Sequence, residues 1–240
     1  MDSECNFTIG HYKYLISEAL HSGYKFCSFN EPTLSDQRVI FLRHDIDVSI
    51  DMALKMAEVE TELGVRSTYF ALPNCSTYNL LEDASLKKLV QIAEMGHWIG
   101  LHIDLPCTVS EAHAIEEIAY AMFVFYANFL PLSPVVSFHR PQPQIFTIKL
   151  PTLVNTYEDR FFKEIKYISD SRGQWREGCP CKMFRGANHP VVQMLIHPVW
   201  WITDRDVNEA WACILENRKT VMKEYLGINV SPFGVLLANS

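Results

Sequence analysis

The chain has 240 residues, of which 48% are hydrophobic and 20% charged, a balance typical of folded globular proteins and not of disordered ones. Its formal net charge of −7 disfavours nucleic acid and anionic membranes as partners, because both attract basic surfaces. No apolar run approaches the roughly 20 residues of a membrane span, and no secretory signal is visible. We therefore predict a cytoplasmic protein with a single domain over residues 1–240.

Segments with helical and strand-like spacing of apolar residues alternate along the chain. Helices are expected at 8–22, 49–63, 83–95, 109–129 and 204–225, and strands at 38–44, 66–72, 98–103, 135–139, 165–169 and 192–196. The helices 49–63 and 83–95 are each followed by a glycine, a frequent signal for a helix end. Strands that alternate with helices form βαβ units, so the pattern predicts an α/β fold with a parallel sheet, either open or closed into a barrel.

The stretch RHDIDVS, residues 43–49, places a histidine and two carboxylates at the end of an apolar strand. Ionisable groups at this position are costly unless they have a partner, and a metal ion is one such partner. The alternative is an ordinary turn in which Asp45 or Asp47 caps the following helix. For Arg43 and His44, the alternative to a role in the site is that they simply form ion pairs with these carboxylates.

Histidines and aspartates also follow other predicted strands. They are His102 and Asp104, His139, Asp170, and His197. In parallel α/β folds the chemistry collects at the C-terminal ends of the strands. Histidines and carboxylates without cysteine suit zinc or a similar divalent ion, at a catalytic and not a structural site.

The seven cysteines are scattered along the chain, apart from Cys179 and Cys181. We interpret them as reduced thiols, since no signal peptide is visible. The CPC sequence has the wrong spacing for a zinc knuckle and no second cysteine pair, so it predicts a tight turn with two incidental thiols.

Six segments in order resemble the polysaccharide deacetylase (NodB-homology) family, in particular an intracellular branch whose first motif reads RHDxD. They are FLRHDIDVS, TYFAL, GHWIGLHID, SFHRP, YISDSRGQW and LIHPVWW, which lie within about residues 38–202. The resemblance implies a distorted, incomplete (β/α) barrel, in agreement with the alternation of helices and strands.

The resemblance also implies roles for the residues of the first two motifs. Asp45 corresponds to the catalytic base and Asp47 to a metal ligand. His102 corresponds to the first of two ligand histidines, but Pro106 stands where the family has the second. We expect His139 to replace it; Asp104 and His97 are the alternatives.

The later motifs imply an acid and its partner. His197 corresponds to the catalytic acid, and Asp170 to the carboxylate that orients this histidine and tunes its pKa. The candidate substrate contacts are Arg140, Trp200 and Trp201, although the two tryptophans have core packing as their alternative.

The function implied by the resemblance is a metal-dependent hydrolase that removes acetyl from an N-acetylated sugar or glycan precursor. Zinc is the expected metal, with cobalt and nickel as alternatives, and a small sugar is the expected partner. Two other functions remain open. One is hydrolysis of another small amide such as a cyclic ureide; the other, favoured by Pro106, is a catalytically inert sugar-binding or scaffold protein.

Overall fold

A computed structural model describes residues 5–31, 36–201 and 207–230 of the chain. Its strands form one sheet, ordered β6-β5-β4-β3-β2-β8-β7, with β1 paired to β2. The strands are β1 (Tyr24–Phe26), β2 (Arg38–Ile46), β3 (Thr68–Ala71), β4 (Trp98–Ile103), β5 (Leu132–Phe138), β6 (Val154–Asn155), β7 (Lys166–Ser169) and β8 (Val191–Ile196). The helices are α1 (Ile9–His21), α2 (Ile50–Glu62), α3 (Asp83–Glu94), α4 (Ala112–Tyr126), α5 (Asp159–Phe162), α6 (Cys181–Gly186) and α7 (Val207–Asn229), with the 3-10 turns η1 (Pro143–Phe146) and η2 (Pro198–Trp201).

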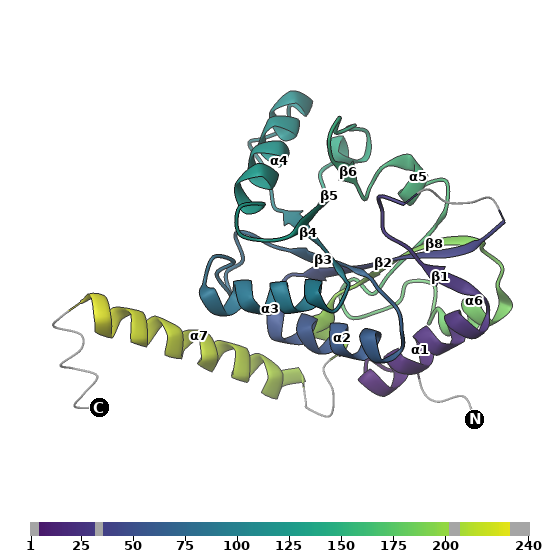
Figure 1. Ribbon diagram of the computed structural model, residues 1–240, viewed down its shortest axis with the longest axis horizontal. Coiled ribbons are helices and arrows are strands. Elements are labelled where there is room, and N and C mark those ends of the chain that lie inside the picture. The colour runs from purple at the N-terminus through teal and green to yellow at the C-terminus, as the bar shows by residue number, and fades with distance from the viewer. Residues whose placement is uncertain (1–4, 32–35, 202–206, 231–240) are drawn as a thin grey trace.

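The strand order is that of a barrel that has not closed. Every strand pair is parallel, and β8 returns to lie beside β2, which pairs with β3 on its other side. The two ends of the sheet, β6 and β7, do not pair with each other. A register shift between Ile99 and Leu101 distorts the pairing of β4 with β5. This topology confirms the expected incomplete (β/α) barrel (Figure 1).

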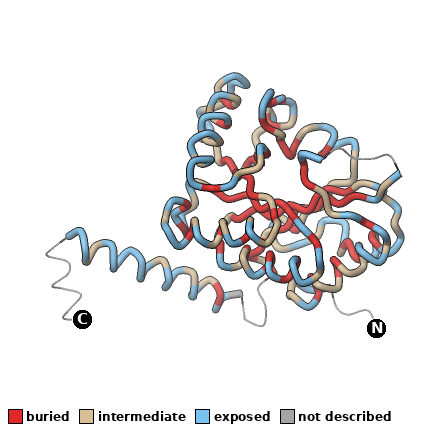
Figure 2. The backbone as a smooth tube through the Cα atoms, in the orientation of Figure 1, coloured by how far each residue is buried: buried red, intermediate tan, exposed pale blue. Residues whose placement is uncertain are grey.

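Helices cover the outer face of the sheet. Figure 1 shows α1, α2 and α3 side by side along this face, whereas α7 extends away from the body of the protein. In Figure 2 the buried backbone is concentrated in the strands, and α7 is mostly exposed. No helix in the described part of the chain is both long and apolar enough to cross a membrane.

The side chains on the inner face of β2 change from apolar to polar along the strand. Successive residues of a strand point to opposite faces, so Val39, Phe41, Arg43 and Asp45 all face the barrel interior. The first two belong to a compact apolar cluster, whose other fully or nearly fully buried members are Phe29, Phe70, Val135 and Phe161. This cluster fills the interior at the N-terminal end of β2. On the inner face of β2, the polar residues are therefore confined to the C-terminal end of the strand.

Each strand expected from the sequence is present, within a few residues of its predicted ends. The C-terminal helix continues to Asn229, and residues 204–206 of the predicted helix lie outside the described residues. Four short elements, β1, β6, α5 and α6, are not predicted from the sequence. These elements have three, two, four and six residues, too few for a periodic pattern to be recognised.

Candidate active site

The turn after β2 is not held by its aspartates. Helix α2 begins at Ile50, and the side chain of Ser49 caps it by accepting a hydrogen bond from the backbone N–H of Met52. Neither Asp45 nor Asp47 therefore caps the helix, which was the alternative interpretation of these two residues. Both side chains line the same cavity at the C-terminal end of the barrel, as the two-residue spacing predicts.

Asp47, His102 and His139 converge on one point. The Asp47 Oδ1 atom lies 3.2 Å from His102 Nε2 and 3.5 Å from His139 Nδ1. The two ring nitrogens are 3.1 Å apart. The three candidate ligand atoms thus lie within 4.8 Å of one another, so His139 occupies the position expected of the third ligand.

This donor set fits a divalent metal ion. Asp47 Oδ1 is buried and makes no hydrogen bond in the structure. Its polar neighbours are the ring nitrogens of His102 and His139, and a cation among these three groups would satisfy the buried oxygen and both imidazoles. Two imidazoles and one carboxylate are a ligand set used by catalytic zinc sites.

Ser137 orients the central histidine of this group. His102 and Ser137 are direct neighbours across β4 and β5, so both side chains face the interior. The Ser137 hydroxyl lies 2.5 Å from His102 Nδ1, which leaves Nε2 for the cluster with Asp47. The sequence segment SFHRP did not lead us to predict a role for Ser137. Its position two residues before His139, on the same face of the strand, was the available signal.

Asp45 is held by a buried arginine. The Arg43 guanidinium donates two hydrogen bonds to the Asp45 carboxylate, from Nε at 2.8 Å and from Nη2 at 2.7 Å. Thr156 and Tyr157 accept further hydrogen bonds from the same guanidinium. Burial raises the pKa of Asp45, but the charges of Arg43 and His102 outweigh it and bring the pKa below its ordinary value. Asp45 is therefore ionised at neutral pH.

His197 and Asp170 form a second fixed pair. His197 Nδ1 lies 2.6 Å from Asp170 Oδ1, and the indole N–H of Trp201 donates to Asp170 Oδ2 at 2.9 Å. Burial alone would lower the pKa of His197, but the hydrogen bond and charge of Asp170, with the aspartates across the site, raise it to about 9. The free Nε2 lies 3.7 Å from Asp47 Oδ2, so the imidazolium faces the candidate metal site.

A cavity of about 820 Å³ connects these groups. Asp45, Asp47, His102, His139 and His197 all line it. Much of the remaining wall is aromatic, from Phe146, Tyr157, Phe162, Tyr167, Trp175 and Trp200. A polar floor with aromatic walls suits a ligand that carries both hydroxyl groups and apolar C–H faces.

The three predicted substrate contacts have different environments. Arg140 and Trp200 line the cavity, and the indole N–H of Trp200 is buried without a hydrogen-bond partner. Arg140 is mostly exposed and donates to Asp104 at 2.6 Å. Trp201, however, is only 1% exposed and lies in the core, where it supports Asp170. The prediction that Trp201 contacts a sugar is therefore wrong, because its ring has almost no exposed surface.

The remaining candidates lie elsewhere. His97 is buried on the helix side of the sheet, where its ring lies 3.5 Å from the carboxylate of Glu60. His44 also pairs with Glu60, at 2.6 Å, and not with the aspartates next to it in sequence. Asp104, the other alternative ligand, is engaged by Arg140. Of these alternatives, none is grouped with Asp47 and His102 as His139 is.

No protein-family model and no curated protein matches the chain. Solved structures that resemble it include a family 4 carbohydrate esterase from Bacillus anthracis (14% identity, 85% of this chain and 84% of that chain covered, TM-score 0.45). They also include the Streptococcus pyogenes deacetylase PplD in complex with acetate (10% identity, 79% and 81% covered, TM-score 0.48). A third is BA3943, a CE4 family pseudoenzyme from Bacillus anthracis (11% identity, 78% and 62% covered, TM-score 0.45). At such identities and TM-scores, we draw no conclusion about activity from these likenesses.

Proposed function

We propose that the protein is a metal-dependent hydrolase that removes the acetyl group from an N-acetylated sugar or glycan precursor. The observation that carries this proposal is the convergence of three kinds of group on one cavity. They are a metal-ligand set, a separate ionised carboxylate, and a histidine held in its charged form.

Asp47, His102 and His139 would hold the metal ion, for which zinc is the best match and cobalt and nickel are alternatives. Such an ion, when bound, polarises an amide carbonyl and lowers the pKa of a water molecule toward about 7. Ser137 holds Nδ1 of His102, so Nε2 is the atom turned to the metal. Hydrogen bonds of this kind raise the affinity of a site for its metal.

Asp45 is the proposed general base. It is ionised, it lines the cavity, and its Oδ2 lies 3.5 Å from His102 Nε2, next to the proposed metal position. The double hydrogen bond from Arg43 fixes the carboxylate plane, so the lone pairs that remain have one orientation. The same hydrogen bonds lower the pKa of Asp45 and make it a weaker base. The hydrolase activity should therefore persist to low pH.

His197 is the proposed general acid. Asp170 holds Nδ1, so the proton on Nε2 is the one available to the departing nitrogen. Because the pKa of His197 is raised to about 9, the imidazole carries this proton at neutral pH. Trp201 and the backbone N–H of His197 complete the hydrogen bonds to the Asp170 carboxylate, which keeps the pair in one geometry.

The aromatic wall supports a sugar as the substrate class. Flat aromatic rings pack against the C–H faces of sugars, while unpaired polar groups hold the hydroxyls. Trp200 offers such a ring, since it lines the cavity. Arg140, at the cavity edge, would contact the outer part of the substrate.

Acetate release from a panel of N-acetylated sugars, with zinc, cobalt or nickel supplied, tests the proposal. The wild-type protein should release acetate, and Asp45→Asn and His197→Ala should lose most of this activity while they retain the metal. The inert scaffold function, which Pro106 favours, predicts no acetate from any sugar and unchanged sugar binding in both variants. Acetate release that survives in both variants would refute the two roles.

A further inference from the structure

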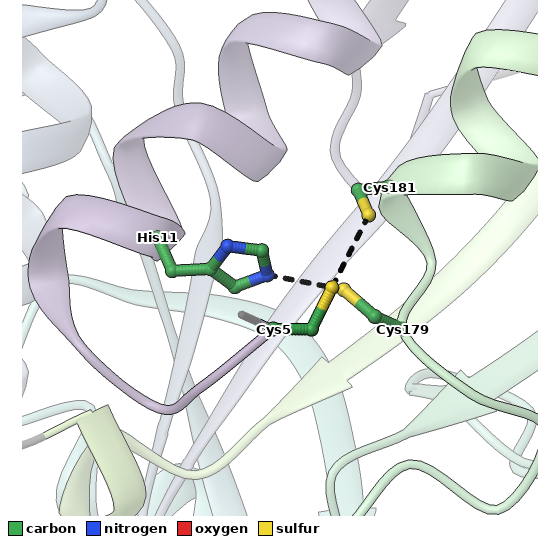
Figure 3. Close-up of side chains that lie close together, drawn as sticks. All are labelled: Cys5, His11, Cys179 and Cys181. Atoms are coloured by element: carbon green, nitrogen blue, oxygen red, sulfur yellow. Dashed lines mark hydrogen bonds between the residues drawn. The ribbon is translucent and has the colours of Figure 1, made fainter. Parts of the chain in front are cut away.

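A second group of metal-ligand side chains lies away from the cavity. Figure 3 shows Cys5, His11, Cys179 and Cys181 pointing toward one another between the N-terminal segment, α1 and the start of α6. The Cys5 and Cys181 sulfurs are 3.7 Å apart, and His11 Nε2 lies 3.1 Å from the Cys179 sulfur. The four candidate ligand atoms all lie within 4.8 Å of one another.

These separations suit a tetrahedral site. Two sulfurs bound to one zinc ion at about 2.3 Å, at the tetrahedral angle, are about 3.8 Å apart. The 3.7 Å between Cys5 and Cys181 matches this value. A disulfide needs about 2.05 Å, and all of the described cysteines are free. The Cys5–Cys181 separation is thus that of two zinc ligands and not of a disulfide.

The donor chemistry points to the same ion. Three thiols and one imidazole are the Cys₃His set of structural zinc sites, which have no position left for water or substrate. His11 and Cys181 are buried, at 6% and 4% exposure, so the site is enclosed by the protein on these sides. The backbone N–H of His11 binds the Thr8 side chain, which fixes the first turn of α1 and the place of the ring.

We propose that Cys5, His11, Cys179 and Cys181 bind a structural zinc ion, separate from the proposed catalytic metal. The ion would join the N-terminal segment to the chain between β7 and α6. That chain carries Trp175, part of the cavity wall, which stacks on Phe7 at a ring distance of 6.1 Å. The zinc ion would thus anchor one wall of the cavity from outside.

Variants that separate the two metal sites provide the test. In Asp47→Ala/His102→Ala, elemental analysis should still find about one zinc per chain, and X-ray absorption should give zinc–sulfur distances of about 2.3 Å. In Cys179→Ser/Cys181→Ser, zinc content should fall by one equivalent relative to wild type. The matched control is Cys107→Ser, because Cys107 is exposed and outside the cluster, and it should leave the zinc content unchanged.

A measurement on the wild-type chain covers the case in which the double cysteine variant does not fold. Three thiols should resist a thiol reagent in the zinc-loaded protein and react once a chelator has removed the metal. The proposal is overturned if sulfur is absent from the zinc shell of Asp47→Ala/His102→Ala. It is also overturned if the cluster holds stoichiometric iron, or if two of its cysteines form a disulfide in protein purified anaerobically with zinc. None of these results depends on the proposed activity.

Discussion

Two clusters of histidines and carboxylates lie on opposite faces of β2. On the inner face, Asp47 meets His102 and His139 at the mouth of the cavity. On the outer face, Glu60 of α2 meets His44 and His97 beneath the helices. The two clusters have nearly the same composition, yet they differ in how many hydrogen bonds their carboxylate oxygens accept.

The Glu60 carboxylate has a partner on every side. One oxygen binds His44 at 2.6 Å and the Tyr12 hydroxyl, and the other binds the hydroxyls of Ser67 at 2.5 Å and Tyr69 at 2.9 Å. Glu60 is fully buried and lines no cavity described above. A carboxylate in this condition has no remaining capacity for a ligand, so we assign the cluster to the stability of the fold.

Asp47 differs in both respects. Its Oδ1 makes no hydrogen bond, and its side chain borders a cavity that a small molecule can enter. Residue types alone therefore do not distinguish a structural cluster from a metal site. What distinguishes the two clusters is that Asp47 has an oxygen without a hydrogen bond and borders a cavity, whereas Glu60 does neither.

The largest expected effect is on catalysis. Replacement of His197 by alanine should reduce kcat by about 10²–10⁴-fold, because general acids contribute on this scale. The corresponding change in the other cluster, His44→Ala, should lower stability and leave kcat of the folded protein near the wild-type value. Steady-state kinetics on both variants check this pair. Equal losses of kcat in the two would break the distinction between the clusters.

The pH profile of kcat/KM follows from the same residue. His197 must be protonated to act, and its pKa is about 9, so activity should decline as the pH rises through about 9. The pKa of Asp45 is below its ordinary value, so the acidic limb should lie below the range of a free aspartate. A profile that falls already near pH 6.5, the ordinary value for histidine, would contradict the role of Asp170.

Acid should destabilise the protein through Glu60. Its folded pKa is about 2, against an ordinary value of 4.5. The stability that ionised Glu60 contributes is therefore complete above pH 4.5 and lost as the pH falls toward 2, by about 3 kcal/mol. Urea unfolding at a series of acidic pH values measures it. In Glu60→Gln the dependence on pH should be shallower, and an unchanged dependence would exclude Glu60 as its source.

Two buried serines form a matched pair with smaller effects. Ser137→Ala should weaken metal binding by about 10–100-fold, since its hydroxyl orients a ligand histidine. Ser67→Ala should leave metal binding unchanged and reduce the free energy of unfolding by about 1.5–3 kcal/mol, because its hydroxyl binds a buried carboxylate. Metal titration and urea unfolding of both variants test the pair; the reverse assignment would contradict our account.

The sequence predicts the barrel well, because its long strands and helices have clear periodicity. It also places Asp47, His102 and His139 at strand ends, and the parallel sheet brings them together. It does not show which way a side-chain ring is turned or which side chains surround it in the core. Trp201 is therefore misplaced by sequence reasoning, since one residue after Trp200 it points into the protein.

The cysteine cluster shows a different limit of sequence reasoning. Cys5 and His11 lie near the start of the chain, more than 160 residues before Cys179, and no local spacing joins them. Only the packing of α1 beside α6 brings the two segments together. A ligand set split over such a distance lacks the short spacings by which zinc motifs are recognised.

The most direct test of the proposed catalytic metal site compares two histidines by their effect on bound zinc. His139 belongs to the Asp47 cluster and His97 to the Glu60 cluster. Elemental analysis of purified His139→Ala and His97→Ala, each folded by circular dichroism, gives the zinc content per chain. We expect His139→Ala to have one equivalent less than wild type and His97→Ala to equal wild type. Full zinc content in His139→Ala, with the loss in His97→Ala, would contradict the metal site described here.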